Sequence, residues 1–276
     1  MVTMAVTTAL VRDTFREALA RKIFWGLFSL STFMILFFLF LLKIDVVAGA
    51  MATMTLFGNV SRKFESQELV RNVYGGIAAF LYTWGLFLAV FASAGLVPSL
   101  LEPGRIELLL SKPVGRVHLL LGRYLGNILV VGSNIVYLVA GVWLIVGVKT
   151  SIWSPGFLYS IATTLFLFAV LLTVVVLLGV AFESGALATM VCALLMILSP
   201  ILAQTRIMDR LLSSEWARQL WKGIYYALPK TYDVGRMTLD LVRDRPIESL
   251  MPLWSSALFA AVVLGIALVI FTRKDY

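Results

Sequence analysis

The chain has 276 residues, of which 61% are hydrophobic and only 14% are charged, and its formal net charge is +8. Ordinary soluble domains contain about 25% charged residues, and a soluble fold of this length could not bury so much apolar surface. The composition therefore excludes a disordered chain, argues against a soluble enzyme and indicates a multi-spanning membrane protein. The single cysteine, Cys192, and the single histidine, His118, exclude an intramolecular disulfide and any site that needs several of either residue.

The chain begins with a segment, residues 1–22, that we expect to form an amphipathic helix at the membrane interface. Val11, Phe15, Ala18 and Leu19 recur at helical spacing between Met4 and Lys22. A helix of this kind lies in the headgroup plane with its arginines in water. The alternative is a soluble N-terminal tail that continues into the first span.

Six apolar stretches are long enough to cross a bilayer core of about 30 Å as helices. None contains Asp, Glu, Lys or Arg, and together they take up nearly half of the chain. We predict spans at residues Ile23–Leu42, Gly75–Val97, Leu125–Val148, Phe157–Val180, Ser184–Ala203 and Leu253–Thr272. The predicted fold is all-α, a multi-pass membrane protein that forms a single transmembrane domain over residues 1–276.

An even number of spans places both termini on one side of the membrane. The positive-inside rule does not identify that side, because 10 of the 23 basic residues lie on the side of the termini and 13 on the other. The orientation therefore stays open from charge alone.

The loop between the second and third spans, residues 98–124, carries the most unusual sequence. Gly104 favours a turn, Arg105–Ser111 has the length of two helical turns, and Pro113 ends that element. We expect a short, stiff element that is apolar on one side and is held between two transmembrane helices. It is either a docking element or a connector that lies on the membrane.

Polar side chains interrupt the third predicted span. Ser133, Asn134 and Tyr137 form a polar patch, and Gly122 and Gly126 form a GxxxG motif at the start of the same helix. Close helix packing explains the glycines. The polar patch predicts hydrogen bonds between helices or the lining of a translocation path.

The loop before the last span, residues 204–252, is unusually long. Apolar residues recur every four positions from Leu212 to Leu228, which predicts an amphipathic helix that ends at Pro229. A second short helix is expected over Tyr232–Val242. Trp and Tyr side chains suit the membrane interface, so the segment is either an interfacial anchor or a cap over an exit path.

The sequence lacks the motifs of several enzyme classes. No Gly-Lys pair occurs, so the chain has no GxxxxGK[ST] phosphate cradle and we expect ATP to be hydrolysed by another polypeptide, if at all. The predicted spans hold no paired carboxylates for intramembrane proteolysis and no charged group for an ion-coupled carrier. We expect no catalytic residue and no bound metal or cofactor.

Residues 98–126 resemble a signature of ABC-2-type transporter permeases. The string Glu102-Pro-Gly-Arg-Ile-Glu-Leu-Leu-Leu-Ser-Lys-Pro113 is followed by Arg116 and by a Gly-Arg-x-x-Gly run, Gly122–Gly126. Phe15–Phe28 is similar to the start of the same family's first helix. The resemblance is strongest to the branch associated with copper-enzyme maturation. Arg105 and Arg123 stand where that family often has Thr and Lys.

The resemblance implies a permease subunit of an ABC exporter in the cell (inner or plasma) membrane, with both termini in the cytoplasm. It implies a separate ABC ATP-binding subunit as partner, a homodimer or heterodimer of permeases, and contact with membrane lipids but not with nucleic acid. The residues it assigns to coupling with the ATPase subunit are Glu102, Gly104, Arg105, Glu107, Leu109, Leu110, Pro113 and Arg116. A non-transporting membrane scaffold or assembly factor is the alternative.

Overall fold

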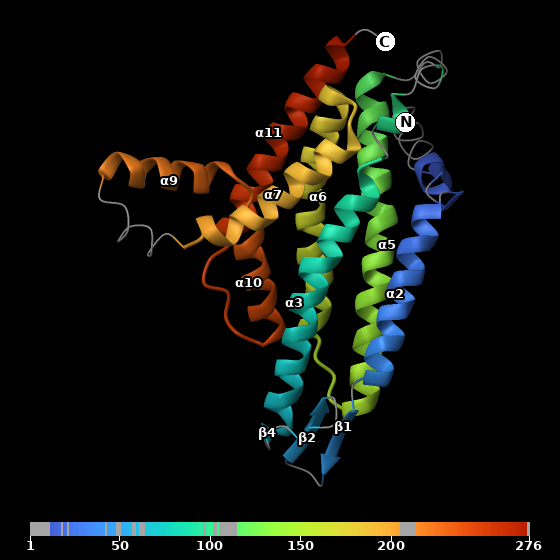
Figure 1. Ribbon diagram of the computed structural model, residues 1–276, viewed down its shortest axis with the longest axis vertical. Coiled ribbons are helices and arrows are strands. Elements are labelled where there is room, and N and C mark those ends of the chain that lie inside the picture. The colour runs from blue at the N-terminus through green and yellow to red at the C-terminus, as the bar shows by residue number, and fades with distance from the viewer. Residues whose placement is uncertain are drawn as a thin grey trace, which may run out of the picture.

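The structure is a computed structural model that describes residues 12–17, 19–20, 22–41, 43–47, 51–56, 59–60, 64–95, 98–101, 104, 115–204 and 214–274. Residues 12–17 and 19–20 are helical. The other helices are α2 (Lys22–Leu41), α3 (Ser66–Ser93), α5 (Arg116–Thr150), α6 (Gly156–Phe182), α7 (Gly185–Leu202), α9 (Glu215–Ala227), α10 (Thr231–Val242) and α11 (Met251–Arg273). Figure 1 shows the long helices side by side in one bundle.

Five segments within the described helices are long and apolar enough to cross a membrane: Val70–Leu100, which contains most of α3, and α5, α6, α7 and α11. The remaining long helix, α2, carries a shorter apolar stretch, Phe24–Phe40. The multi-pass helical membrane protein that the sequence predicts is therefore confirmed. α6 lies at the centre of the bundle, because it packs against α3, α5, α7, α10 and α11.

Two helices begin well before the predicted spans. α3 begins at Ser66 rather than Gly75, and α5 begins at Arg116 rather than Leu125. The added turns contain polar and charged residues, which an apolar run leaves out. The backbone nonetheless continues as a helix, since its hydrogen bonds do not depend on the polarity of the side chains.

A small antiparallel sheet separates α2 from α3, at the end of the bundle where α5 ends and α6 begins (Figure 1). Its strands are β1 (Lys43–Val47), β2 (Met51–Leu56), β3 (Asn59–Val60) and β4 (Phe64–Glu65). β2 pairs with the other three strands. These strands are not predicted by the sequence pattern, and they add a β element to an otherwise helical protein.

In the described part of the segment between α7 and α11 there are two helices, close to the predicted bounds. α9 ends at Ala227 and has no buried residue, and Figure 1 shows that it extends sideways from the bundle. α10 is different, because it packs against α3, α6 and α7. Thr238 of α10 donates a hydrogen bond to the Thr163 hydroxyl of α6 over 2.8 Å, so α10 is part of the bundle rather than a helix that lies over it.

Lys230 fixes the turn between α9 and α10. Its side chain is almost fully buried, and its ammonium group donates to the carbonyl of Tyr225 and lies 3.6 Å from the centroid of that residue's ring. Burial lowers the pKa of Lys230, while the nearby Asp233 carboxylate raises it. The backbone N–H of Lys230 donates to Ser256 of α11. The turn therefore holds α9, α10 and α11 together.

Candidate functional site: the coupling end and the path between α2, α3 and α5

The N-terminal helical residues lie directly against the beginning of α5. Thr14 is 1% exposed and packs on Gly126. A Cβ atom at Gly126 would lie 2.5 Å from the Cβ of Thr14, which is closer than two carbon atoms approach. The GxxxG motif, Gly122–Gly126, therefore allows close helix packing. The N-terminal helical residues are one of the segments that pack against it.

Arg123 stabilises this contact through ion pairs with the N-terminal helical residues. It is 7% exposed, and its guanidinium group donates a hydrogen bond to the carboxylate of Glu17 and lies 3.9 Å from that of Asp13. The Glu17 side chain is 18% exposed. In such a partly dehydrated position the loss of one partner is costly, because the other charge stays buried without compensation.

The same end of the bundle also holds the end of α11. Arg116, the first residue of α5, donates hydrogen bonds to the carbonyls of Thr272 and Lys274. The Lys274 ammonium group pairs with Glu183, which follows α6 in the left-handed conformation, with φ 55°. The beginning of α5, the end of α6 and the end of α11 are therefore joined by side chains. The helical N-terminal residues lie at this same end through Arg123.

Most of the residues that the sequence assigns to ATPase coupling lie outside the described residues, namely Glu102, Arg105, Glu107, Leu109, Leu110 and Pro113. Gly104 has φ +79°, a conformation that glycine adopts without strain, and this agrees with the predicted turn. The chain leaves α3 through a short 3₁₀ turn, Pro98–Leu100, with Leu100 and Leu101 buried in the core. The loop thus starts from an anchored segment and ends at Arg116, which is also anchored.

The predicted path residues, Ser133, Asn134 and Tyr137, are used mainly in contacts within the bundle. The Ser31 hydroxyl of α2 donates to the Asn134 carbonyl over 2.8 Å. Tyr137 stacks on Phe28 and shares a hydrogen bond with Thr32. Ser133 donates to the carbonyl of Val130 in its own helix. The two α2 hydroxyls were missed in the sequence, although polar residues within an apolar stretch were a visible signal.

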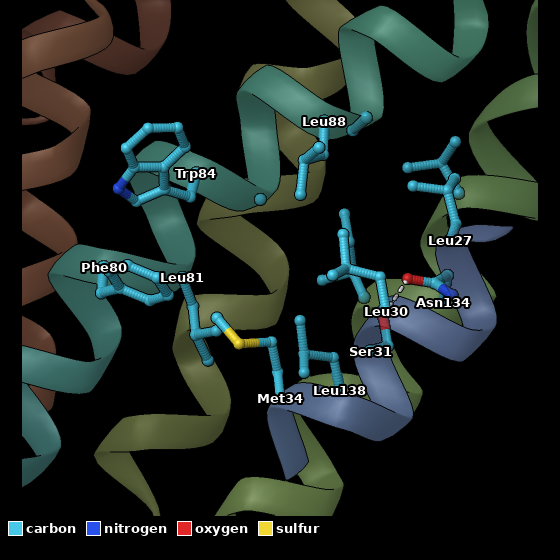
Figure 2. Close-up of a pocket in the computed structure, with 14 residues that line it drawn as sticks. Leu27, Leu30, Ser31, Met34, Phe80, Leu81, Trp84, Leu88, Asn134 and Leu138 are labelled. Carbon is cyan, nitrogen blue, oxygen red and sulfur yellow. Dashed lines mark hydrogen bonds between the residues drawn. The ribbon is translucent and has the colours of Figure 1, made fainter. Parts of the chain in front are cut away.

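Asn134 also faces a cavity between α2, α3 and α5. Figure 2 shows the Ser31–Asn134 hydrogen bond on one side of this space and Phe80, Leu81 and Trp84 of α3 on the other. The cavity has a volume of about 50 Å³, enough for a few water molecules but too small for most substrates. Among the described residues, the buried amide nitrogen of Asn134 has no hydrogen-bond partner. Ser133 and Tyr137 do not line the space.

Across the described ranges, no cluster of three or more His, Cys, Asp or Glu side chains has an arrangement that could hold a metal ion. This part of the molecule has one end at which several helices are bonded together, and a narrow cavity beside Asn134 between α2, α3 and α5.

Comparison with known proteins agrees with the sequence signature. No curated protein matches the chain. The family model described as "ABC-2 family transporter protein" matches residues 8–276, which include every helix described above. The protein belongs to the ABC-2 family of transporter proteins.

Proposed function

We propose that this permease subunit of an ABC transporter works as an exporter driven by a separate ATP-binding subunit. Family membership supports a permease and, in general, an ABC ATPase partner. The finer proposal is that residues 98–124 contact the ATPase and that ATP-driven closure pushes on this loop. The push tilts α3 and α5, and so opens the narrow space at Asn134 toward the other side of the membrane.

The observation that carries this proposal is the joined end of the bundle. The loop from Leu101 to Arg116 connects α3 to α5, and the start of α5 is bonded to the N-terminal helix through Arg123 and to α11 through Arg116. Force applied to the loop therefore reaches several helices at once. Such bonds are what a transmission element requires.

The chain is proposed to form a homodimer or heterodimer of permeases in the cell membrane, with both termini in the cytoplasm. Exposed aromatic side chains follow one face of α3 at Phe80, Trp84, Phe87 and Phe91, where lipid or a second permease can cover them. Membership of the copper-enzyme maturation branch stays a prediction from the residues.

Co-purification tests the function directly. The tagged permease, extracted from its native membrane in a mild detergent, is expected to recover an ABC ATPase encoded beside it. The rate of ATP turnover should differ between this complex and the ATPase subunit alone. A permease that recovers no ATPase from its own cells, across several detergents, would favour the scaffold or assembly factor.

Orientation is the first separate prediction. In a Cys192→Ala background, Ser249→Cys in the exposed segment between α10 and α11 should react with a membrane-impermeant maleimide in intact cells. Ser111→Cys, in the proposed cytoplasmic loop, should react only after the cells are opened. Cys192 is fully buried, so its replacement removes a background thiol without exposing a surface. Labelling of Ser111→Cys but not of Ser249→Cys in intact cells would reverse the assignment.

The second prediction concerns ATP itself. The isolated permease should neither bind nor hydrolyse ATP, because the chain contains no Gly-Lys pair and hence no P-loop. The measurement is phosphate release by the purified chain, compared with a heat-inactivated sample. Sustained turnover by a preparation free of any second polypeptide would contradict the proposed division of labour.

A further inference from the structure

A second, larger cavity lies between α3, α7 and α10, away from Asn134. Its volume is about 310 Å³, at the lower end of the range typical of small-molecule sites. The α3 residues that line it are Ala79, Tyr82, Thr83 and Leu86, and the α7 residues are Met196 and Pro200. The remaining wall is the α10 face made by Thr231, Tyr232, Gly235, Arg236 and Leu239.

The walls of this cavity are held in place by hydrogen bonds between helices. Tyr82 of α3 donates to the carbonyl of Thr231 over 2.6 Å, and the N–H of Tyr232 donates to Ser199 of α7 over 3.0 Å. Gly235 lets α10 approach α3, because a Cβ there would lie 2.7 Å from the Tyr82 ring. α10 is therefore bonded to both neighbours, and the space between them is built into the fold.

Pro200 interrupts the backbone hydrogen bonding of α7 at this wall. A proline inside a helix donates no hydrogen bond to the carbonyl four residues earlier, which here is that of Met196. Both residues line the cavity. The floor is made by the buried side chains of Tyr82, Leu86 and Thr231, so polar atoms are few and the interior is mostly apolar.

The mouth of the cavity is polar and contains the charged side chain of Arg236. Thr83, Tyr232 and Arg236 are all exposed. Arg236 also borders a smaller polar hollow that contains Asp233, Asp240 and Glu248, yet among the described residues no carboxylate lies within ion-pair distance of its guanidinium group. An apolar interior, with an arginine at its mouth that forms no ion pair among the described residues, is complementary to a molecule that has a hydrocarbon chain and an anionic head.

We propose that this cavity binds an anionic membrane lipid, with one acyl chain between α3, α7 and α10 and the headgroup phosphate against Arg236. Two of the three walls belong to candidate membrane spans, so acyl chains are the molecules that surround the opening. Arg236 favours an anionic headgroup because its guanidinium group forms no ion pair among the described residues. This inference goes beyond the transport function and does not depend on it.

Photo-crosslinking in lipid nanodiscs tests the proposal without any ATPase subunit. The discs consist of phosphatidylcholine with a small fraction of either phosphatidylglycerol or phosphatidylcholine that carries a diazirine in its acyl chain. We expect peptides of α3, α7 and α10 to be labelled about fivefold more by the phosphatidylglycerol probe, which is the ratio an exposed ion pair supports. Equal labelling by the two probes would overturn the proposal.

Three variants assign the effect to residues. Arg236→Gln should lower the ratio of the two probes to about one, whereas Arg245→Gln, an exposed arginine outside the cavity, should leave it unchanged. Ala79→Phe should fill the space and reduce labelling by both probes, provided that the variant elutes as wild type in size-exclusion chromatography. A fivefold ratio that persists in Arg236→Gln would also overturn the proposal.

A further arm of the crosslinking experiment distinguishes a membrane lipid from a soluble ligand of the same chemistry. Dodecyl phosphate, added from the aqueous side to discs of phosphatidylcholine alone, carries the charged group without belonging to the bilayer. If it protects these peptides from the phosphatidylcholine probe while phosphatidylglycerol shows no preference, the lipid assignment is wrong. Preference for phosphatidylglycerol in the absence of dodecyl phosphate supports it.

Discussion

Leu109→Asp is expected to abolish recovery of the ATPase subunit and, with it, transport. If Leu109 and Leu110 insert into a groove of the ATPase, each acts as an anchor whose truncation costs about 2 kcal/mol or more of binding free energy. A buried aspartate without a partner costs more than a truncation. The measurement is an affinity pull-down of the ATPase by wild type and variant at equal expression, followed by a transport assay.

Leu250→Asp serves as the matched control for this experiment. It makes the same kind of substitution outside residues 98–124, at the exposed position that directly precedes α11. A negative charge is tolerated at the beginning of a helix, so recovery of the ATPase should be close to that of wild type. Equal recovery of the ATPase by Leu109→Asp and wild type would show that residues 98–124 only connect α3 to α5.

Arg116→Ala is a poorer control than the sequence alone indicates. A residue at the rim of an interface contributes little to binding, so the sequence predicts a small effect on docking. In the folded chain, however, Arg116 also holds the carbonyls of Thr272 and Lys274. Its removal should therefore loosen the end of α11 whether or not the ATPase is bound.

The second large effect is expected from Arg123→Met. The substitution keeps the aliphatic stem but leaves the Glu17 carboxylate, which is only 18% exposed, without its main partner. Breaking a buried pair in this way costs roughly 3 kcal/mol of unfolding free energy. It should also free the N-terminal helical residues, so that trypsin cleaves sooner after Arg12 and Arg16. Thermal unfolding in detergent and the rate of cleavage measure the two effects.

Arg71→Met is the comparison that makes this prediction specific. Arg71 also pairs with a carboxylate, that of Asp244 at 3.1 Å, but the two side chains are 50% and 53% exposed. Exposed pairs contribute at most about 1 kcal/mol. A double-mutant cycle with Glu17→Gln isolates the Arg123 pair from other effects of the substitution. Similar losses in Arg71→Met and Arg123→Met would show that the N-terminal helix is not clamped by this pair.

The transmembrane architecture could be predicted because burial in lipid imposes a simple rule on the sequence. A spanning helix needs an apolar run of sufficient length, and these runs stand out between Gly75 and Thr272. The rule does not apply where a helix leaves the hydrocarbon, so the polar starts of α3 and α5 were missed. The strands over Lys43–Glu65 were missed for a related reason, because they lie between spans, where hydropathy gives no signal.

The candidate site could be predicted only in part. Ser133, Asn134 and Tyr137 stand out as polar residues in an apolar helix, but their partners Ser31, Thr32 and Phe28 lie about a hundred residues away. Arg123 was recognised as part of a family signature, yet nothing in its spacing pairs it with Glu17. Such pairs depend on how the helices pack, which a local pattern does not specify. The burial of α10 was not predicted for the same reason, since its sequence has the pattern of an ordinary amphipathic helix.

The length of α5 has a consequence for how the two faces of the membrane communicate. Its 35 residues extend about 52 Å at 1.5 Å per residue, well beyond a hydrocarbon core of about 30 Å. One end is clamped by Arg116 and Arg123, and near the other end Lys149 donates a hydrogen bond to the carbonyl of Leu39, beside the sheet. α5 is therefore one continuous helix that is bonded to its neighbours at both ends. A small rotation imposed on it at one membrane surface should displace the sheet and the end of α2 sideways at the opposite surface.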